Sequence, residues 1–307
     1  MPSASEIIVC PAERRAEAVA LVLADLAPSQ RREIAGGLPD AGNTADRTDE
    51  PLYVALRDGR LTGAAWGQRQ AGNIAVFWPP QLASGEHAAT ADQLAEAVVG
   101  ALDRSAIEMM QVVLPAIDDS VIELLNHVGF RHLADLIYLT CEANRFPSSR
   151  SAASELEFVA YDDAQRHRLE TLIERTYEGS LDCAALNGAR SIDEVVNGYQ
   201  ATGMFRPENW LFVRHDRADV GVLLMADHAA AGHWELMYMG LTPEARGRGW
   251  GGQITRHAQV LAGRAKVQRI VVAVDEKNIP ALRMYGRTGF EAWDRRTVYI
   301  RFPEQDR

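Results

Sequence analysis

Apolar and polar residues follow one another along this chain in an order that occurs twice. In each half, a helical pattern, at 11–26 or 163–177, is followed by two strand-like runs joined by a short turn. The two predicted hairpins cover 51–68 in the first half and 209–227 in the second. This mixed succession of strands and helices predicts an α/β (α+β) fold.

The later part of each half is repeated as well. The first half contains D-D-S-V-I-E-L-L-N-H-V-G-F and the second contains N-I-P-A-L-R-M-Y-G-R-T-G-F, and a strand-like run follows each, at 136–141 or 297–302. The pairs Gly129-Phe130 and Gly289-Phe290 lie 160 positions apart. Self-similarity over the length of a whole domain predicts tandem copies of one fold.

The segment that separates the two copies, at 144–155, is rich in Ser and contains one Pro, which is typical of a linker. We therefore predict a first domain over 1–146, a linker over 147–155 and a second domain over 156–307. Within the second domain, the long polar segment at 176–207 is either a ligand-binding insertion or a surface helix pair.

A glycine-dense motif, R-G-R-G-W-G-G at 246–252, carries the strongest functional signal. It follows the strand-like run at 234–240 after a short turn that contains Pro, and it precedes an amphipathic helical pattern at 253–262. A turn of this kind leaves backbone N–H groups free at the positive end of the helix dipole, and such a site binds phosphate.

Two kinds of side chain in this motif suit a phosphate ligand. Gly249 and Gly251 allow phosphate groups to approach the backbone closely, because no side chain intervenes. Arg246 and Arg248 add positive charge where a pyrophosphate would lie. The motif therefore predicts a pyrophosphate site.

Composition narrows the classes of partner. The net charge is −10, which argues against nucleic acid as a partner. No apolar run is long enough to span a bilayer, and the first residues lack the pattern of a signal peptide, so we expect a cytoplasmic protein. The three cysteines, Cys10, Cys141 and Cys183, are far apart and predict neither a disulfide framework nor a metal site.

Taken together, these motifs resemble the GNAT superfamily of N-acetyltransferases. The acyl-coenzyme A signature of that family, Arg/Gln-x-x-Gly-x-Gly/Ala, is matched by Arg246, Gly249 and Gly251. The Asn…Ala…Tyr…Gly-Phe helix of the family is matched by Asn278, Ala281, Tyr285 and Gly289-Phe290. The resemblance implies two tandem acyl-CoA N-acyltransferase domains, each with a mixed, mostly antiparallel sheet flanked by helices. Tandem members that this chain resembles include mycothiol synthase.

The first half departs from the family pattern. After the strand-like run at 73–78, the sequence P-P-Q-L-A-S-G-E-H-A-A-T contains no Arg-x-x-Gly-x-Gly. Pro79 and Pro80 would also remove two backbone donors where phosphate would bind. The position that matches Tyr285 is Leu125, which cannot exchange a proton. We therefore expect a degenerate first copy that does not bind the cofactor.

For the second half, the resemblance implies that acetyl-CoA is the acyl donor and that no metal takes part. Backbone groups of Met239 and Leu241 would hold the pantetheine arm in the manner of an added strand. Asn278 would contact the same arm and cap a helix. The expected pyrophosphate cradle consists of Arg246, Gly247, Arg248, Gly249, Gly251 and Gly252.

Acetyl transfer to an amine needs a base and an acid, and the resemblance implies Glu235 for the first role and Tyr285 for the second. Glu244 and Asp227 are rival bases. A solvent-facing Glu235 and a Tyr285 that serves only the core are the structural alternatives to these assignments.

Strict alternation along the run 234–240 would put Glu235 on one face together with Met237 and Met239. A carboxylate among methionine side chains is poorly solvated, and we expect this to raise its pKa.

The acceptor pocket is expected at 177–205, where the family determines acceptor specificity. Four side chains there would suit a cationic amine, although charged helix residues are commonly solvated: Tyr177, Glu178, Asp182 and Glu194. Trp210 and Trp234 are candidates for apolar walls or for core residues, and His233 is a weaker candidate for the pocket.

The predicted partner is a primary amine of a small molecule or peptide, with no nucleic acid and no membrane, and the oligomeric state stays open. The alternative is a non-catalytic acyl-CoA-binding or sensing module that acts through a protein partner.

Overall fold

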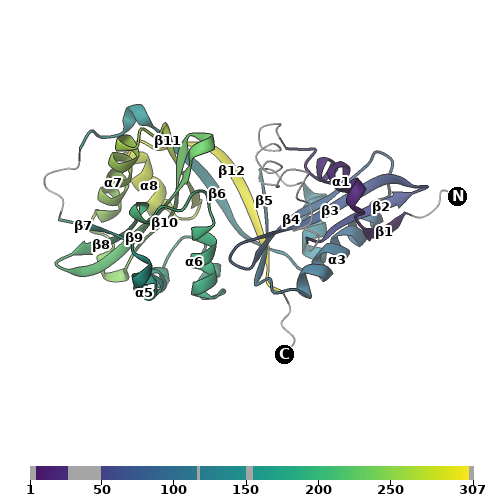
Figure 1. The fold of residues 1–307 in the computed structure, drawn as a ribbon, viewed down its shortest axis with the longest axis horizontal. Coiled ribbons are helices and arrows are strands. Elements are labelled where there is room, and N and C mark those ends of the chain that lie inside the picture. The colour runs from purple at the N-terminus through teal and green to yellow at the C-terminus, as the bar shows by residue number, and fades with distance from the viewer. Residues whose placement is uncertain (1–4, 27–49, 116–117, 150–154, 304–307) are drawn as a thin grey trace. The chain divides into compact units, whose positions relative to one another are not determined.

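The chain folds into two α/β units, each with helices on both faces of a mixed, mostly antiparallel sheet (Figure 1). This confirms the predicted fold class. The computed structural model describes residues 5–26, 50–115, 118–149 and 155–303. Among them, none of the helices combines the length and apolar character that crossing a bilayer requires.

Unit 1 comprises Met1–His132 together with Val298–Arg307. Its strands, in sheet order, are β1 (Glu6–Val9), β2 (Leu52–Arg57), β3 (Arg60–Gln70), β4 (Ile74–Leu82), β5 (Met109–Leu114) and the end of β12 (Glu291–Arg301). Strands β1 to β4 pair antiparallel, and β4 pairs with β5 in parallel. One face is covered by α1 (Arg15–Val22), and the other by α3 (Ala89–Asp103) and α4 (Asp119–His127).

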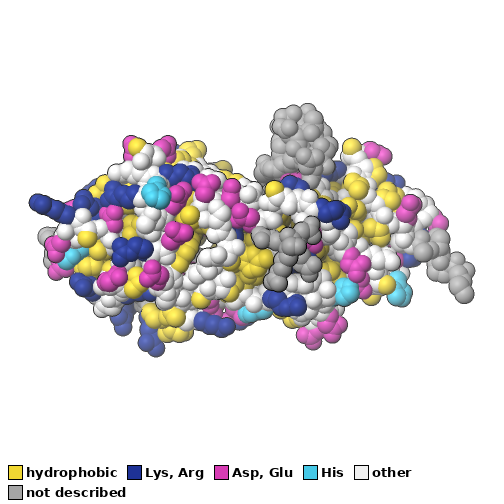
Figure 2. Space-filling model, turned by 90° about the horizontal axis from the view of Figure 1, so that it is seen from below, with side chains coloured by type: hydrophobic (Ala, Val, Ile, Leu, Met, Phe, Trp, Pro, Cys, Tyr) yellow, Lys and Arg dark blue, Asp and Glu magenta, His cyan; other side chains and the backbone are white. Residues whose placement is uncertain are grey.

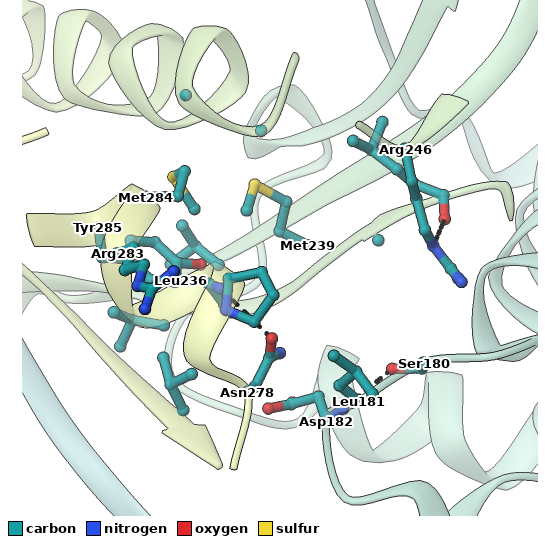
Figure 3. A pocket seen from close by; sticks show the side chains of 18 of the residues that line it. Ser180, Leu181, Asp182, Leu236, Met239, Arg246, Asn278, Arg283, Met284 and Tyr285 are labelled. Atoms are coloured by element: carbon teal, nitrogen blue, oxygen red, sulfur yellow. Dashed lines mark hydrogen bonds between the residues drawn. The ribbon is translucent and has the colours of Figure 1, made fainter. Parts of the chain in front are cut away.

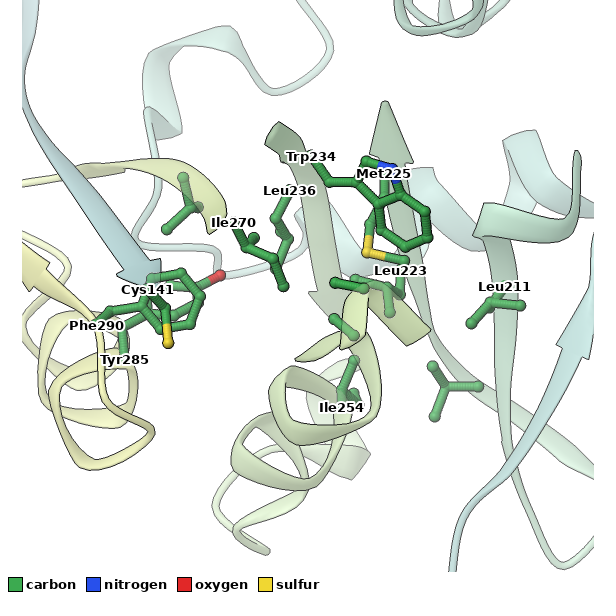
Figure 4. Close-up of a cluster of buried hydrophobic side chains, with 14 of the residues drawn as sticks. Cys141, Leu211, Leu223, Met225, Trp234, Leu236, Ile254, Ile270, Tyr285 and Phe290 are labelled. Atoms are coloured by element: carbon green, nitrogen blue, oxygen red, sulfur yellow. The ribbon is translucent and has the colours of Figure 1, made fainter. Parts of the chain in front are cut away.

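Unit 2 comprises Leu133–Thr297. Its strands, in sheet order from β6, are β6 (Arg131–Glu142), β11 (Arg269–Asp275), β10 (His233–Leu241), β9 (Ala218–His228), β8 (Trp210–His215) and β7 (Glu157–Ala160). Helices α5 (Arg166–Tyr177) and α6 (Ile192–Gln200) cover one face. On the other face, α7 (Trp250–Arg264) and α8 (Ile279–Arg287) bury the apolar cluster of Figure 4.

The last strands of the two repeats are exchanged. Strand β6, from the first repeat, pairs antiparallel with β11 of the second, from Leu136↔Asp275 to Glu142↔Arg269. The end of β12 lies beside β5 in unit 1, where Tyr299 joins the core under α3 and α4. The predicted domain limits follow the repeats along the sequence, whereas the compact units differ from them: unit 2 includes 133–146 of the predicted first domain, and unit 1 includes 298–303 of the predicted second.

Both predicted hairpins are confirmed. In the first, Asp58 and Gly59 have φ values of 50° and 76°, and in the second, Asp216 and Arg217 have φ values of 48° and 67°. Positive φ at two central residues is the requirement of a tight two-residue hairpin. The second hairpin meets it without glycine, and within it the Arg214 guanidinium donates to the Arg217 carbonyl at 2.7 Å.

Pro79 and Pro80 of the first repeat lie elsewhere than predicted. Pro79 and Pro80 are part of β4, which continues to Leu82, so the expectation that they replace the phosphate-binding turn is wrong. The turn between β4 and α3 spans 83–88, and its distinctive residue is Glu86.

The Glu86 carboxylate sits at the N-terminus of α3 with its side chain only 1% exposed. It accepts hydrogen bonds from the His87 backbone N–H (3.0 Å), the Thr90 hydroxyl (2.9 Å) and the Ser5 hydroxyl (3.0 Å). These bonds, the one from His87 first, lower the pKa of Glu86 to about 2. A side-chain anion therefore already lies beside the start of α3, where the helix dipole would attract a phosphate. This supports the prediction that the first copy does not bind the cofactor.

On the face drawn in Figure 2, basic and acidic side chains of the described residues are interspersed. Arginine side chains project beside carboxylates, as in the pairs Arg168–Asp219 and Arg206–Asp227. Much of the positive charge is therefore compensated locally.

Candidate functional site

A split between two parallel strands creates the site. Strand β10 pairs with β11 only from His233↔Arg269 to Glu235↔Val271. It pairs with β9 on its other side as far as Leu241. Beyond Glu235, the edge of β10 that faced β11 is open, and a cavity of about 860 Å³ lies there.

Four segments line this cavity, all of them in unit 2 (Figure 3). They are the open part of β10 (236–241), the glycine-dense turn with the start of α7 (246–256), the end of β11 with α8 (272–288), and the end of α5 with the loop that follows it (176–182). Because the sheet is split, side chains from both of its faces reach one cavity.

A β-bulge in β10 changes which side chains face α7. The register with β9 shifts between Leu236 and Tyr238, so Met237 is an extra residue. Leu236 and Met239 both pack on the α7 side, while Met237 and Tyr238 pack toward α5. The predicted strict alternation is therefore wrong beyond Leu236.

The glycine-dense turn has the geometry that its sequence predicts. Helix α7 begins at Trp250, and Gly249, its N-cap residue, has a φ of 75°, while Gly247 has a φ of 78°. A Cβ atom on either would have no heavy atom within 4 Å, so it is the left-handed backbone that requires glycine there. No side chain caps this helix end in the described structure, and Gly249, Gly251 and Gly252 all line the cavity.

The Arg246 side chain lines the cavity and bonds to the protein backbone. Its guanidinium donates to three backbone carbonyls: those of Leu241 (3.1 Å), Glu178 (2.6 Å) and Thr176 (2.8 Å). It thereby ties the C-terminal end of α5 to the end of β10, as a cation at a helix C-terminus commonly does. Arg248 lies over the ring of Trp250 at 5.0 Å from the ring centre.

Glu235 lies at the point where β10 and β11 separate, but it is not among the residues that line the cavity. Its carboxylate is 2.9 Å from Nε2 of His228 and is 37% exposed. The expectation that methionine side chains enclose it is wrong, because the bulge turns Met239 to the other face. The rival bases are engaged in ion pairs outside the cavity lining, Asp227 with Arg206 (2.8 Å) and Glu244 with Arg175 (3.4 Å).

Tyr285 and Asn278 both line the cavity. The Tyr285 ring is buried against Phe290, with 5.2 Å between ring centres, and burial raises the pKa of its hydroxyl. The hydroxyl therefore keeps its proton at neutral pH. Asn278 caps α8, since its side-chain oxygen accepts the Ala281 backbone N–H at 3.3 Å.

Of the four acceptor candidates, Asp182 lines the cavity, whereas Tyr177, Glu178 and Glu194 do not. Tyr177 instead belongs to an aromatic group with Tyr238, at 5.8 Å between ring centres.

The structure also shows where the tryptophan and histidine candidates lie. Trp210 and Trp234 are core residues, 0% and 5% exposed. His233 lies outside the lining of the cavity and stacks on His228.

Three arginines that line the cavity were not identified from the sequence: Arg256, Arg283 and Arg287. Arg283 and Arg287 are four residues apart on α8, so they share one helix face, and Arg256 projects from the second turn of α7. The four-residue spacing of Arg283 and Arg287 on α8, the helix that also carries Tyr285, was the signal in the sequence that could have identified them.

Comparison with known proteins shows which family this region resembles. Residues 180–290 match the model of the Acetyltransferase (GNAT) family. A stretch of 99 residues is 33% identical to the mycothiol acetyltransferase of Streptomyces bingchenggensis (strain BCW-1) and covers 31% of each protein. The match therefore spans about a third of that curated relative.

Solved structures share the whole fold. A GCN5-related N-acetyltransferase from Sphaerobacter thermophilus superposes with a TM-score of 0.66 and 15% identity, over 99% of this chain and 98% of the other. A tandem GNAT protein from the clavulanic acid biosynthesis pathway superposes with a TM-score of 0.55 and 14% identity, over 99% and 100%. At these identities the likeness shows the fold, which is that of two tandem GNAT units.

Proposed function

Since residues 180–290 of this chain match the model of the GNAT acetyltransferase family, we propose that the protein transfers the acetyl group of acetyl-CoA to a primary amine of a small molecule or peptide. The observation that carries the proposal is the cavity of unit 2, where an uncapped helix N-terminus and an open strand edge lie side by side. Such a pair suits a ligand that has phosphates at one end and an amide-containing arm at the other.

The residues at the helix end fit the diphosphate of coenzyme A. The backbone N–H groups of Gly251 and Gly252 lie in the first turn of α7, where a helix has no internal acceptors for them. Gly247 and Gly249 keep the approach open, and Arg248 is a nearby cation. We assign the Arg246 side chain to the clamp between α5 and β10, so its contribution to the cradle comes from its backbone.

The open edge of β10 fits the pantetheine arm. Backbone groups of Met239 and Leu241 would pair with its amides, and Asn278 would contact it from the start of α8. The three arginines at the cavity, Arg256, Arg283 and Arg287, add positive charge for the phosphates.

When bound, acetyl-CoA supplies a carbonyl carbon that is activated by its thioester bond. Glu235 accepts the proton that the ammonium group of the acceptor must lose, through a water molecule because its side chain does not line the cavity. The new N–C bond forms as the C–S bond breaks, and the Tyr285 hydroxyl donates a proton to the departing sulfur. The proton that the acylated nitrogen then loses restores the Tyr285 hydroxyl. A backbone N–H near Met239 stabilises the carbonyl oxygen.

Release of free thiol from acetyl-CoA in the presence of a panel of primary amines tests the proposal. We expect turnover with at least one amine, and loss of most of it in Glu235→Gln and Tyr285→Phe, with the affinity for acetyl-CoA retained. Tight binding of acetyl-CoA without turnover on any amine, peptide or aminoglycoside would contradict the proposal and favour a sensor that acts through a protein partner.

A further inference from the structure

The cavity contains a single carboxylate among the described residues that line it, Asp182. The other charged side chains at its walls are all arginines. Arg256, Arg283 and Arg287 lie on α7 and α8, whereas Asp182 belongs to the loop after α5 (Figure 3). The guanidinium of the fourth, Arg246, is engaged by the carbonyls of Leu241, Glu178 and Thr176. Asp182 is therefore the one negative side chain among the described residues at this cavity.

The Asp182 carboxylate is fixed in place. One of its oxygens, Oδ1, accepts the backbone N–H of Asp275 at 3.0 Å, and the Asn278 side chain donates to the carboxylate as well. In return, the Cys183 backbone N–H donates to Oδ2 of Asp275 at 3.3 Å. The loop after α5 is thus joined to the end of β11 by reciprocal bonds.

The backbone beside Asp182 is strained, which supports a role beyond that of a surface loop. Cys183 has a φ of 43°, a left-handed conformation that a residue with a Cβ rarely adopts. Such strain persists only where surrounding contacts enforce it, and it is concentrated at ligand sites.

The surroundings leave the negative charge of Asp182 poorly compensated. Burial raises the pKa of Asp182, and the nearby charge of Asp275 raises it further, against the two hydrogen bonds that lower it. The Asp275 carboxylate is itself satisfied by the Cys183 and Lys277 backbone N–H groups, at 3.3 and 2.8 Å. A cation that entered the cavity would therefore gain most at Asp182.

Asp182 also lies near the predicted acid. Its charge contributes to the raised pKa of Tyr285, and it acts on Tyr238 in the same way. A group bound at Asp182 would consequently be held close to the Tyr285 hydroxyl and to the open edge of β10.

We propose that Asp182 is the specificity-determining residue for the acceptor, and that it selects small primary amines that carry a positive charge. The inference rests on the proposed function and deepens it, because it names the charge class of the second substrate. The Asp182 carboxylate receives the cation by a charge-assisted hydrogen bond, while its bonds to Asp275 and Asn278 hold its direction. Acidic amines would be repelled at this point.

Two substitutions of Asp182 distinguish recognition of a cationic acceptor from anchoring of the loop after α5. Asp182→Asn keeps the shape and an oxygen that can accept the Asp275 N–H, but it removes the charge. Asp182→Ala removes both. If Asp182 only anchored the loop, Asn would be tolerated and Ala would be harmful to every acceptor alike.

We expect Asp182→Asn to raise the KM for cationic alkylamines about ten- to hundredfold, with the dissociation constant of acetyl-CoA unchanged. The KM for an uncharged arylamine acceptor should change less than about twofold. As a readout independent of turnover, calorimetry with butylammonium and the protein bound to desulfo-CoA should show the same loss of affinity. Glu174→Gln is the matched control, since Glu174 is an exposed carboxylate on α5 outside the cavity lining.

The outcomes are distinct. An active wild-type protein in which Asp182→Asn leaves cationic acceptors unaffected, or weakens charged and neutral acceptors equally, would overturn this inference alone. A wild-type protein that binds acetyl-CoA but acetylates no amine would overturn the proposed function, and the inference with it.

Discussion

Replacing Arg246 by Ala distinguishes a structural clamp from a phosphate ligand. The guanidinium donates to three carbonyl oxygens, at 3.1 Å (Leu241), 2.6 Å (Glu178) and 2.8 Å (Thr176). A hydrogen bond from a charged donor contributes about 1.5–3 kcal/mol when shielded from water. The bond to Glu178 is exposed and contributes less.

The free energy of unfolding of unit 2 should therefore fall by about 2–4 kcal/mol in Arg246→Ala. For a unit of this size, each kcal/mol shifts the Tm by about 2–4 °C, so we expect a Tm that is roughly 5–15 °C lower. Arg246→Lys should restore little, because an ammonium group cannot reach three carbonyls with the fixed fork of a guanidinium.

Thermal unfolding followed by calorimetry measures this effect, and titration with acetyl-CoA at low and high salt measures the other role. If the side chain is a clamp, the salt dependence of the remaining acetyl-CoA affinity should match that of the wild type. An unchanged Tm combined with weaker binding and a flatter salt dependence would refute the reasoning and return Arg246 to the phosphates.

Four further outcomes are expected. Tyr285→Phe should lower kcat about a hundredfold or more with little change in acetyl-CoA affinity in calorimetry, and an unchanged kcat would show that Tyr285 serves only the core. Gly249→Ala should destabilise the left-handed turn by about 1–2 kcal/mol and weaken acetyl-CoA binding, whereas equal affinity would remove the turn from the site. The double substitution Arg283→Ala with Arg287→Ala should flatten the salt dependence of acetyl-CoA binding, measured by the same titration, and an unchanged slope would exclude these arginines as phosphate ligands. In unit 1, the pKa of Glu86 is lowered from 4.5 to about 2, so its contribution to stability is complete above pH 4.5 and is lost as the pH falls toward 2. Glu86→Gln should therefore unfold about 2 kcal/mol more easily at neutral pH, and urea unfolding of the two proteins should converge near pH 2, while a constant difference at all pH values would contradict this origin.

Local patterns in the sequence were sufficient to predict much of the fold. The hairpins, the helix after the glycine-dense turn and the α8 motif each depend on residues that are close together in the chain, such as Gly249 at the N-cap of α7. Periodicity and the backbone demands of glycine are properties of these residues themselves.

The features that were missed depend on pairing between distant segments. The bulge at Met237 is defined by the register against β9, which no pattern within β10 reveals. The direction of the Arg246 side chain depends on carbonyls of α5, a helix some 70 positions away in the sequence. The extent of β4 through Pro79 and Pro80 was hidden because proline ordinarily ends a strand.

The exchange of final strands was hidden for a further reason. Strands β6 and β12 follow equivalent motifs in the two repeats, so either one satisfies the apolar pattern that would complete either sheet. The choice is made by three-dimensional packing, in which Arg301 bonds to Asp103 in unit 1 and Thr297 bonds to Asp135 in unit 2.

This exchange of strands determines the order in which the two units can complete their folding. Residues 298–303, which complete unit 1, leave the ribosome only after all of unit 2 has been made. During translation, β5 therefore lacks the neighbour that it has in the finished protein until β12 has been made. Cutting the gene between the repeats would likewise separate each sheet from the final strand that it holds in the intact chain, and each fragment would have only its own final strand with which to complete its sheet.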